Sequence, residues 1–133
     1  MGKCVARMTH PDSKERKGYL SVCFSQEPNR IYGGGFGTDI SLWTIKGDFH
    51  QMQSTHNHKD WVSRIRCSPN KQLPYFASTG WDGRMKIYNN KFNVNSSFKA
   101  HSEAIYALDI SKNGNHLATA GRDKCVKVWK CKQ

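Results

Sequence analysis

Apolar residues recur in this chain at an equal spacing of 43 residues. Within each group they alternate, or nearly alternate, with polar residues, which is typical of a half-buried β-strand. The three groups are Tyr19, Val22 and Phe24; Val62, Ile65 and Cys67; and Ile105, Leu108 and Ile110. An equal spacing of this length predicts three copies of one structural unit.

A second regularity follows each group, because an apolar residue is paired with an aromatic residue twelve positions later. The pairs are Ile31 and Trp43, Phe76 and Tyr88, and Leu117 and Trp129. The second copy contains two extra residues near 71–74. A surface turn tolerates such an insertion because closing a slightly longer loop costs little free energy.

The pattern predicts strands separated by short turns throughout the chain, with no helix. The expected strands are residues 3–8, 19–25, 30–34, 39–44 and 49–53, then about 62–67, one ending at 78, 85–88 and 95–99, and finally 105–111, 115–120 and 125–130. Residues 45–48 are expected to form a hairpin turn. The Asn113-Gly114 pair predicts a type I′ turn between the first two strands of the third copy.

Polar residues recur at the same period as the apolar ones. His58, Ser78 and Asp82 have the composition of a hydrolase triad, but His101, Thr119 and Asp123 repeat it one copy later. A catalytic triad occurs once in an active site, so the repetition favours a structural hydrogen-bond network. The pattern is that of the WD repeat, in which an aromatic residue completes the network. Tyr88 fills that position in the second copy and Trp129 in the third.

These features predict an all-β fold, a WD40 β-propeller present as an incomplete arc of three sequence repeats. Each repeat is expected to supply the outer strand (d) of one blade and the three inner strands (abc) of the next. The predicted boundaries are 1–53 for a degenerate first repeat, 54–94 for the second and 95–133 for the third. Three repeats leave bare sheet edges. We therefore expect the remaining blades to come from the same or another chain.

The first repeat departs from the pattern. Gly33 occupies the Ser position and Gly37 the Asp position, although Trp43 is present. We therefore expect no hydrogen-bond network around Trp43 and the least stable of the three blades. The run from Gly33 to Gly37 lacks the Gly-Lys-Ser/Thr and the spacing of a phosphate-binding loop.

The charge of the chain suggests a polyanionic partner. The formal net charge is +11, of which residues 54–98 carry +5 and residues 99–133 carry +4. Nucleic acid is the leading candidate, and a basic surface kept for solubility is the alternative. The five cysteines are odd in number and form no CxxC pair, which favours reduced thiols in the cytoplasm. No spacing indicates a metal site, a cofactor or a membrane-spanning segment.

The second repeat carries a family resemblance. His58 to Asn70 (HKDWVSRIRCSPN) and the later Ser78 to Asn89 (STGWDGRMKIYN) resemble the fourth repeat of the receptor for activated C kinase family. By position, the chain resembles repeats three to five of seven. The resemblance implies a non-enzymatic scaffold on the small (40S) ribosomal subunit, with ribosomal RNA, ribosomal proteins and protein kinase C-type signalling proteins as partners. The family contacts RNA through an Arg-Asp-Lys corner of its first repeat, which this chain lacks.

We therefore predict a cytoplasmic scaffold that links signalling proteins to translation. The same tripeptide occurs here in a later repeat as Arg122-Asp123-Lys124, so Arg122, Lys124 and Lys127 are the candidate contacts to RNA or another partner. The alternative is a signalling or ubiquitin-pathway adaptor that binds peptides on a propeller face. Lys-Cys-Lys follows Trp129, where ubiquitin-ligase receptors carry Trp-Asp-x-Arg, which counts against the ubiquitin version.

Overall fold

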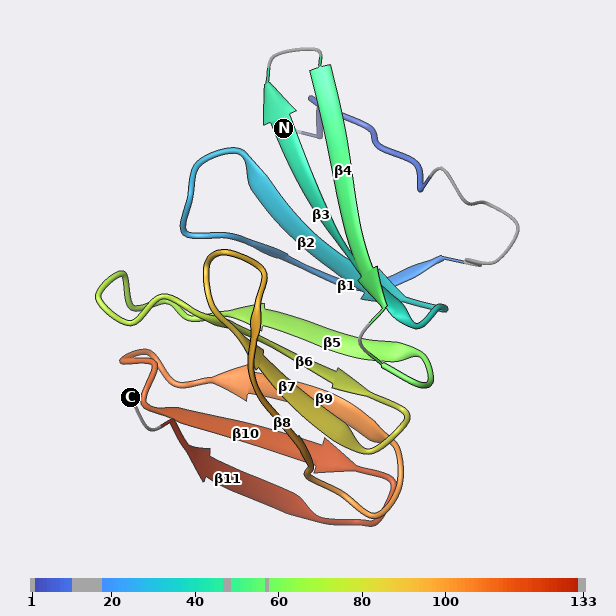
Figure 1. Cartoon of the computed structure of the whole chain (residues 1–133), viewed down its shortest axis with the longest axis vertical. Helices are drawn as coiled ribbons and strands as arrows, with labels where there is room; N and C mark the ends of the chain where they lie inside the picture. Colours follow the sequence, from blue (N-terminus) through green and yellow to red (C-terminus); the bar gives the residue numbers. More distant parts are fainter. Residues whose placement is uncertain (1, 11–17, 47–48, 57, 132–133) are drawn as a thin grey trace.

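The computed structural model describes residues 2–10, 18–46, 49–56 and 58–131. Within these ranges the chain forms eleven strands in three antiparallel sheets and no helix (Figure 1). The strands are β1 (Tyr19–Phe24), β2 (Arg30–Gly35), β3 (Asp39–Lys46), β4 (Phe49–His56), β5 (Val62–Cys67), β6 (Phe76–Gly80), β7 (Arg84–Tyr88), β8 (Val94–Lys99), β9 (Ile105–Ile110), β10 (His116–Gly121) and β11 (Val126–Lys130).

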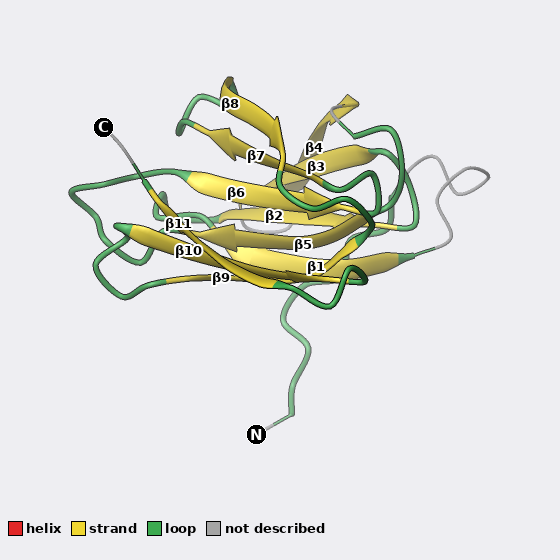
Figure 2. Cartoon of the chain, turned by 90° about the horizontal axis from the view of Figure 1, so that it is seen from below, coloured by secondary structure: helices red, strands yellow, loops and turns green. Residues whose placement is uncertain are grey.

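Each sheet is a meander in which every strand pairs with its neighbour in sequence. The first blade is β1 to β4, the second is β5 to β8, and the third is β9 to β11. Figure 1 shows the three blades one after another along the long axis of the molecule. In Figure 2, β1 and β9 lie along one side and β4 and β8 along the other. The first strands of neighbouring blades contact each other, β1 with β5 and β5 with β9, so they lie at the inner side of the arc, and β4 and β8 lie at its outer side.

Strand register confirms that the three copies are equivalent. The apolar and aromatic residues twelve positions apart are direct partners across neighbouring strands. The pairs are Ile31 with Trp43, Phe76 with Tyr88, and Leu117 with Trp129. The same frame places Gly33, Ser78 and Thr119 at equivalent positions, and likewise Tyr19, Val62 and Ile105.

The core lies between the blades, since each sheet buries one face against its neighbour. One apolar cluster fills the boundary between the first and second blades, and its large members are Tyr32, Ile40, Leu42, Ile65, Phe76 and Tyr88. A second cluster fills the next boundary, with Tyr75, Met85, Ile105, Leu108, Ile110 and Leu117. Burial of this apolar surface is the main force that holds adjacent blades together.

The fold class is confirmed as an all-β arc of propeller blades, and among the described residues the third blade has three strands and no outer strand, as predicted. The strand expected at residues 3–8 is wrong, because these residues form no strand (Figure 2). Val5 is 91% exposed, and no described strand offers these residues a ladder partner. The first blade therefore begins the described arc without a preceding outer strand.

Two turn predictions have different outcomes. The predicted hairpin at 45–48 includes residues 47–48, which lie outside the described residues. The type I′ turn at Asn113-Gly114 is wrong: a type I′ turn needs positive φ at both central residues, and here only Gly114 has it, at 78°. Gly114 N donates to Ser111 O at 2.9 Å, and the Asn113 side chain accepts from Asn115 N, so the connection runs over the longer segment 111–115.

Candidate functional site

The structure brings the four polar residues of the second repeat together inside the second blade. His58 precedes β5, and its Nε2 lies 2.7 Å from Ser78 Oγ on β6. Ser78 Oγ is in turn 3.1 Å from Tyr88 Oη on β7. On the other side of the imidazole, Nδ1 lies 3.1 Å from Asp82 Oδ2, in the turn between β6 and β7. The network therefore connects the entry loop, two strands and a turn.

The third blade repeats this geometry with a different aromatic residue. His101 Nε2 lies 2.8 Å from Thr119 Oγ1, and its Nδ1 lies 2.9 Å from Asp123 Oδ2. Trp129 Nε1 donates to Thr119 Oγ1 at 2.9 Å. The side chains of both His58 and His101 have no exposed surface. Buried polar groups of this kind stabilise a fold when every member has a partner.

Ser78, His58 and Asp82 have the connectivity of a catalytic triad but not its accessibility. A nucleophilic serine must present its hydroxyl to a substrate. Ser78 is 0% exposed, and its oxygen is already shared between His58 and Tyr88. The geometry therefore supports a structural use of these residues.

Hydrogen bonding keeps both corner aspartates ionised. Burial on its own would raise the pKa of Asp82, but hydrogen bonds from His58 and from the backbone N–H groups of Lys59 and Arg84 outweigh it and lower the pKa from 3.8 to about 2. The pKa of Asp123 is also lowered, chiefly by its hydrogen bond with His101. A carboxylate that accepts several hydrogen bonds is stabilised in its charged form.

The first blade contains a different network, so the expectation that Trp43 has no polar partner is wrong. Trp43 Nε1 donates to Tyr19 Oη at 3.2 Å, and Tyr19 Oη donates to Ser41 Oγ at 3.0 Å. His10 Nε2 lies 3.0 Å from Asp39 Oδ2 in the same blade. The sequence pattern missed this arrangement because Tyr19 occupies the position of Val62 and does not belong to the repeating polar set.

Two glycines of the first blade allow this packing. A Cβ atom at Gly33 would lie 2.9 Å from Tyr19 Cε1, so the missing side chain makes room for the tyrosine ring. A Cβ atom at Gly34 would lie 2.6 Å from Val62 Cγ1 of the second blade. Protein interiors are packed densely enough that neither overlap could be absorbed without movement. The glycine run is therefore a packing adaptation of this blade.

The three candidate contact cations occupy different environments. Arg122 and Lys124 lie in the turn between β10 and β11; the Arg122 side chain is 70% exposed and lies 3.9 Å from Glu103. Lys127 does not project freely, because its Nζ donates to Ala100 O at 2.8 Å and lies 5.9 Å from the centre of the Trp129 ring. Arg122 and Lys124 are exposed and Lys127 is partly buried, so the prediction of partner contact is best served by the first two cations.

Sequence reasoning missed a row of aromatic side chains that crosses all three blades. The rings of Phe36 and Trp61 are 4.8 Å apart, those of Trp61 and Trp81 are 4.7 Å apart, and those of Trp81 and Tyr106 are 6.1 Å apart. We call these four residues the aromatic row. Trp81 and Tyr106 remain 38% and 46% exposed. The sequence could have indicated the aromatic row, because Trp61 precedes β5 and Trp81 follows β6, and these two connections meet at the same end of the antiparallel pair.

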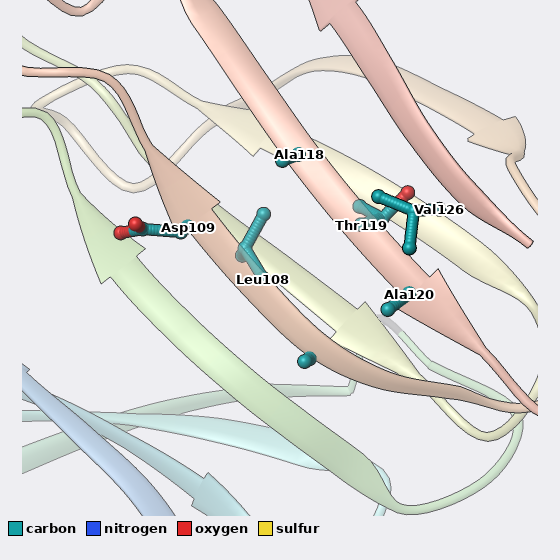
Figure 3. Close-up of a pocket in the computed structure, with 7 residues that line it drawn as sticks. Leu108, Asp109, Ala118, Thr119, Ala120 and Val126 are labelled. Carbon is teal, nitrogen blue, oxygen red and sulfur yellow. The ribbon is translucent and has the colours of Figure 1, made fainter.

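Two hollows accompany the second and third blades. A cavity of about 460 Å³ lies between them and is lined by residues including Leu73, Phe98 and Trp129. A shallower hollow of about 180 Å³ lies on the sheet of the third blade. Figure 3 shows Leu108, Asp109, Ala118 and Val126 among its lining residues. In the ranges that the structure describes, no three His, Cys, Asp or Glu side chains are grouped to hold a metal ion. The same ranges contain no helix long and apolar enough to cross a membrane.

The blades and their repeated networks define a WD-repeat propeller protein. The chain belongs to the WD40 family, "WD domain, G-beta repeat", whose model matches residues 49–89 and 92–130. Each match starts at or just before the outer strand of one blade and includes three strands of the next, which confirms the predicted d-abc order for those two repeats. Proteins of this family are generally non-enzymatic scaffolds.

The chain is similar to several curated WD-repeat proteins. It is 33% identical over 73 residues to Cross-pathway control WD-repeat protein 2 of Flammulina velutipes, covering 54% of this chain and 23% of that protein. It is 33% identical over 84 residues to Small ribosomal subunit protein RACK1 of Neurospora crassa, covering 62% and 27%. It is 30% identical over 88 residues to Small ribosomal subunit protein RACK1y of Oryza sativa subsp. japonica, covering 65% and 25%. The matches thus span about a quarter of each relative's length.

Proposed function

We propose that this chain acts as a cytoplasmic WD-repeat scaffold that associates with the small ribosomal subunit and links signalling proteins to it. The observation that carries the proposal is the positive charge of the second and third repeats, +9 over residues 54–133, in a chain similar to two small ribosomal subunit proteins. Ribosomal RNA presents a dense array of phosphates, and exposed Lys and Arg side chains bind phosphate.

Lys124 adds local support for this role. Its φ is 69°, a conformation that costs a residue with a Cβ atom about 1 to 2 kcal/mol. The equivalent turn of the second blade has Gly83 with φ 78°, which carries no such cost. Backbone conformations of this kind concentrate at functional positions. Together with the exposed Arg122, Lys124 forms the basic corner that we assign to RNA.

The test is co-sedimentation with purified small ribosomal subunits over a range of salt concentrations. Each phosphate neutralised contributes about −0.7 to −0.9 to the slope of log K against log salt. We expect Arg122→Glu with Lys124→Glu to weaken binding and to reduce the steepness of that slope. Lys71→Glu with Lys112→Glu is the matched control, because it changes the charge equally in turns at the opposite ends of the strands. Equal binding by the two double variants would remove the basic corner from the proposal.

The aromatic row favours a second candidate, an adaptor that binds peptides on one propeller face. Trp81 and Tyr106 present partly exposed rings beside one another, and exposed aromatic residues are enriched among the anchors of protein interfaces. Selection of a displayed peptide library against the chain tests this candidate. Peptides whose binding is lost in Trp81→Ala but kept in Val94→Ala, an exposed apolar residue of β8, would favour the adaptor. Peptides that bind both variants equally would count against it.

A further inference from the structure

Two cysteines from adjacent blades meet at the boundary between them. Cys23 lies on β1 of the first blade and Cys67 on β5 of the second, and their Sγ atoms are 2.6 Å apart. Both cysteines are partly buried, and both are free thiols in this structure. A disulfide bond is about 2.05 Å long. The two sulfurs therefore need only a small shift in order to bond.

Hydrogen bonds to the second blade hold the backbone in place on both sides of Cys23. Two residues before Cys23, the hydroxyl of Ser21 accepts a hydrogen bond from Ile65 N at 3.0 Å. Three residues after Cys23, the side-chain amide of Gln26 donates to Ser68 O at 2.6 Å and to Asn70 O at 2.8 Å. These bonds hold β1 beside β5, so the two thiols meet without any rearrangement of the backbone.

The pair is not a by-product of the repeat. In the strand register, Cys23 is equivalent to Arg66 and Cys67 is equivalent to Ile110, so Arg66 and Ile110 occupy the same positions at the next boundary. Of the other cysteines, Cys4 and Cys125 are exposed. A thiol pair is therefore a particular feature of the boundary between the first and second blades.

We propose that Cys23 and Cys67 are a reversible thiol–disulfide site that covalently joins the first two blades under oxidising conditions. The inference is independent of the proposed ribosomal role. With hydrogen peroxide as the oxidant, two S–H bonds break and one S–S bond forms. The two electrons and two protons released convert the peroxide into two molecules of water. A dithiol reductant reverses the reaction by exchange, as in other redox-sensing pairs.

The surroundings of Cys23 favour its protonated form. The hydrogen bond with Cys67 and burial both raise the pKa of Cys23, and the positive charge of Arg66 only partly opposes this rise. Cys23 consequently keeps its proton at neutral pH, and a protonated thiol is a poor nucleophile. Oxidation gives a sulfenic acid on one of the two sulfurs, which the other sulfur then attacks, forming the S–S bond and releasing water.

Peptide mapping of the folded, full chain tests the site. The chain is treated with hydrogen peroxide, remaining thiols are alkylated, and the product is digested with trypsin without reduction. The expected product joins the peptides 18–30 and 67–71, which contain Cys23 and Cys67, and dithiothreitol should separate them. The oxidised chain should also melt roughly 5 °C or more higher than the reduced chain, since the new bond closes a loop between residues 44 apart.

Single substitutions distinguish this pair from indiscriminate oxidation. Cys23→Ser and Cys67→Ser should each abolish the linked peptide and the gain in melting temperature, whereas Cys125→Ser should leave both unchanged. Oxidation in a denaturant should scatter the linkages over all five cysteines. The proposal is overturned if both thiols of the folded wild-type chain remain alkylatable after peroxide treatment. It is also overturned if Cys23 or Cys67 is linked mainly to another cysteine.

Discussion

The first and second blades provide a polar partner for their third-strand aromatic residue in two different ways. In the second blade, the first strand carries Val62, and the buried imidazole of His58 bonds Ser78 Oγ on the second strand. In the first blade, the equivalent positions hold Tyr19 and Gly33. The tyrosine ring enters the space that the glycine leaves, and its hydroxyl provides the polar partner of Trp43. A blade thus needs a polar partner for its third-strand aromatic residue, but not one fixed set of side chains.

This comparison changes what is expected of the first blade. A blade without the His, Ser and Asp set was predicted to be the least stable of the three. Trp43 is only 8% exposed, whereas Trp129 of the third blade is only partly buried at the edge of its cluster. Both indole N–H groups donate a hydrogen bond. The aromatic residue of the first blade is therefore at least as well packed as that of the third.

The largest expected effect is that of Trp43→Ala. Truncation of a buried large aromatic residue costs about 3 to 5 kcal/mol, and the variant also leaves Tyr19 Oη without its indole donor. Trp129→Ala should cost less, because part of that ring is already in contact with water. Urea unfolding of both variants measures the difference. A larger loss for Trp129→Ala would restore the original view of a weak first blade.

Replacing Gly33 with Ser should show that Tyr19 and Gly33 act as a unit. The new Cβ would overlap the Tyr19 ring, which predicts a loss of about 1 to 3 kcal/mol. Combining Gly33→Ser with Tyr19→Val recreates the side chains of the second blade at these positions. In a double-mutant cycle, the pair should be less destabilising than the sum of the two single changes. Strict additivity would mean that the two residues are packed independently.

The second blade should respond to acid through Asp82. Its pKa is about 2 in the folded chain, below the ordinary value of 3.8, so the ionised carboxylate stabilises the folded state above about pH 4. That stabilisation, about 1 kcal/mol after allowance for solvent, should disappear as the pH falls through 2. Unfolding of the wild type and of Asp82→Asn from pH 6 to pH 2 provides the measurement. The two stability curves should converge at the acidic end, and parallel curves would contradict the assignment.

The smallest effect is expected for His10→Ala, which tests whether the segment before β1 contributes to the first blade. The variant removes the imidazole 3.0 Å from the buried Asp39, and loss of one such hydrogen bond costs about 0.5 to 1.5 kcal/mol. His58→Ala in the second blade is the comparison and should cost more, since two partners lose their bonds. Equal unfolding midpoints for His10→Ala and the wild type would exclude a contribution from this segment.

Sequence periodicity was sufficient to predict most strands and to group His58, Ser78 and Asp82, because residues at a repeat spacing occupy equivalent positions in equivalent sheets. It failed where a residue acts outside its repeat position. Tyr19 stands where the other repeats have Val and Ile, and nothing in the pattern marks it as the partner of Trp43. The apolar residues within 3–8 predicted a strand, but a strand also requires a neighbouring strand with which to form backbone hydrogen bonds. The bond from Lys127 to Ala100 was also not predictable, because alternation along β11 does not reveal the carbonyl of Ala100.

The spacing of contacts between blades has a consequence for how the chain folds. Within each sheet, strands pair with their neighbours in sequence. Hydrogen bonds between blades, such as Ser21 to Ile65 and Asn70 to Asn113, join residues 44 and 43 positions apart. Hairpins form in microseconds and close only short loops, so each blade can assemble before its long-range partners arrive. During synthesis from the N-terminus, the apolar face of a completed blade is covered by the next blade after only about one further repeat has been made. This shortens the time for which that surface is exposed to aggregation.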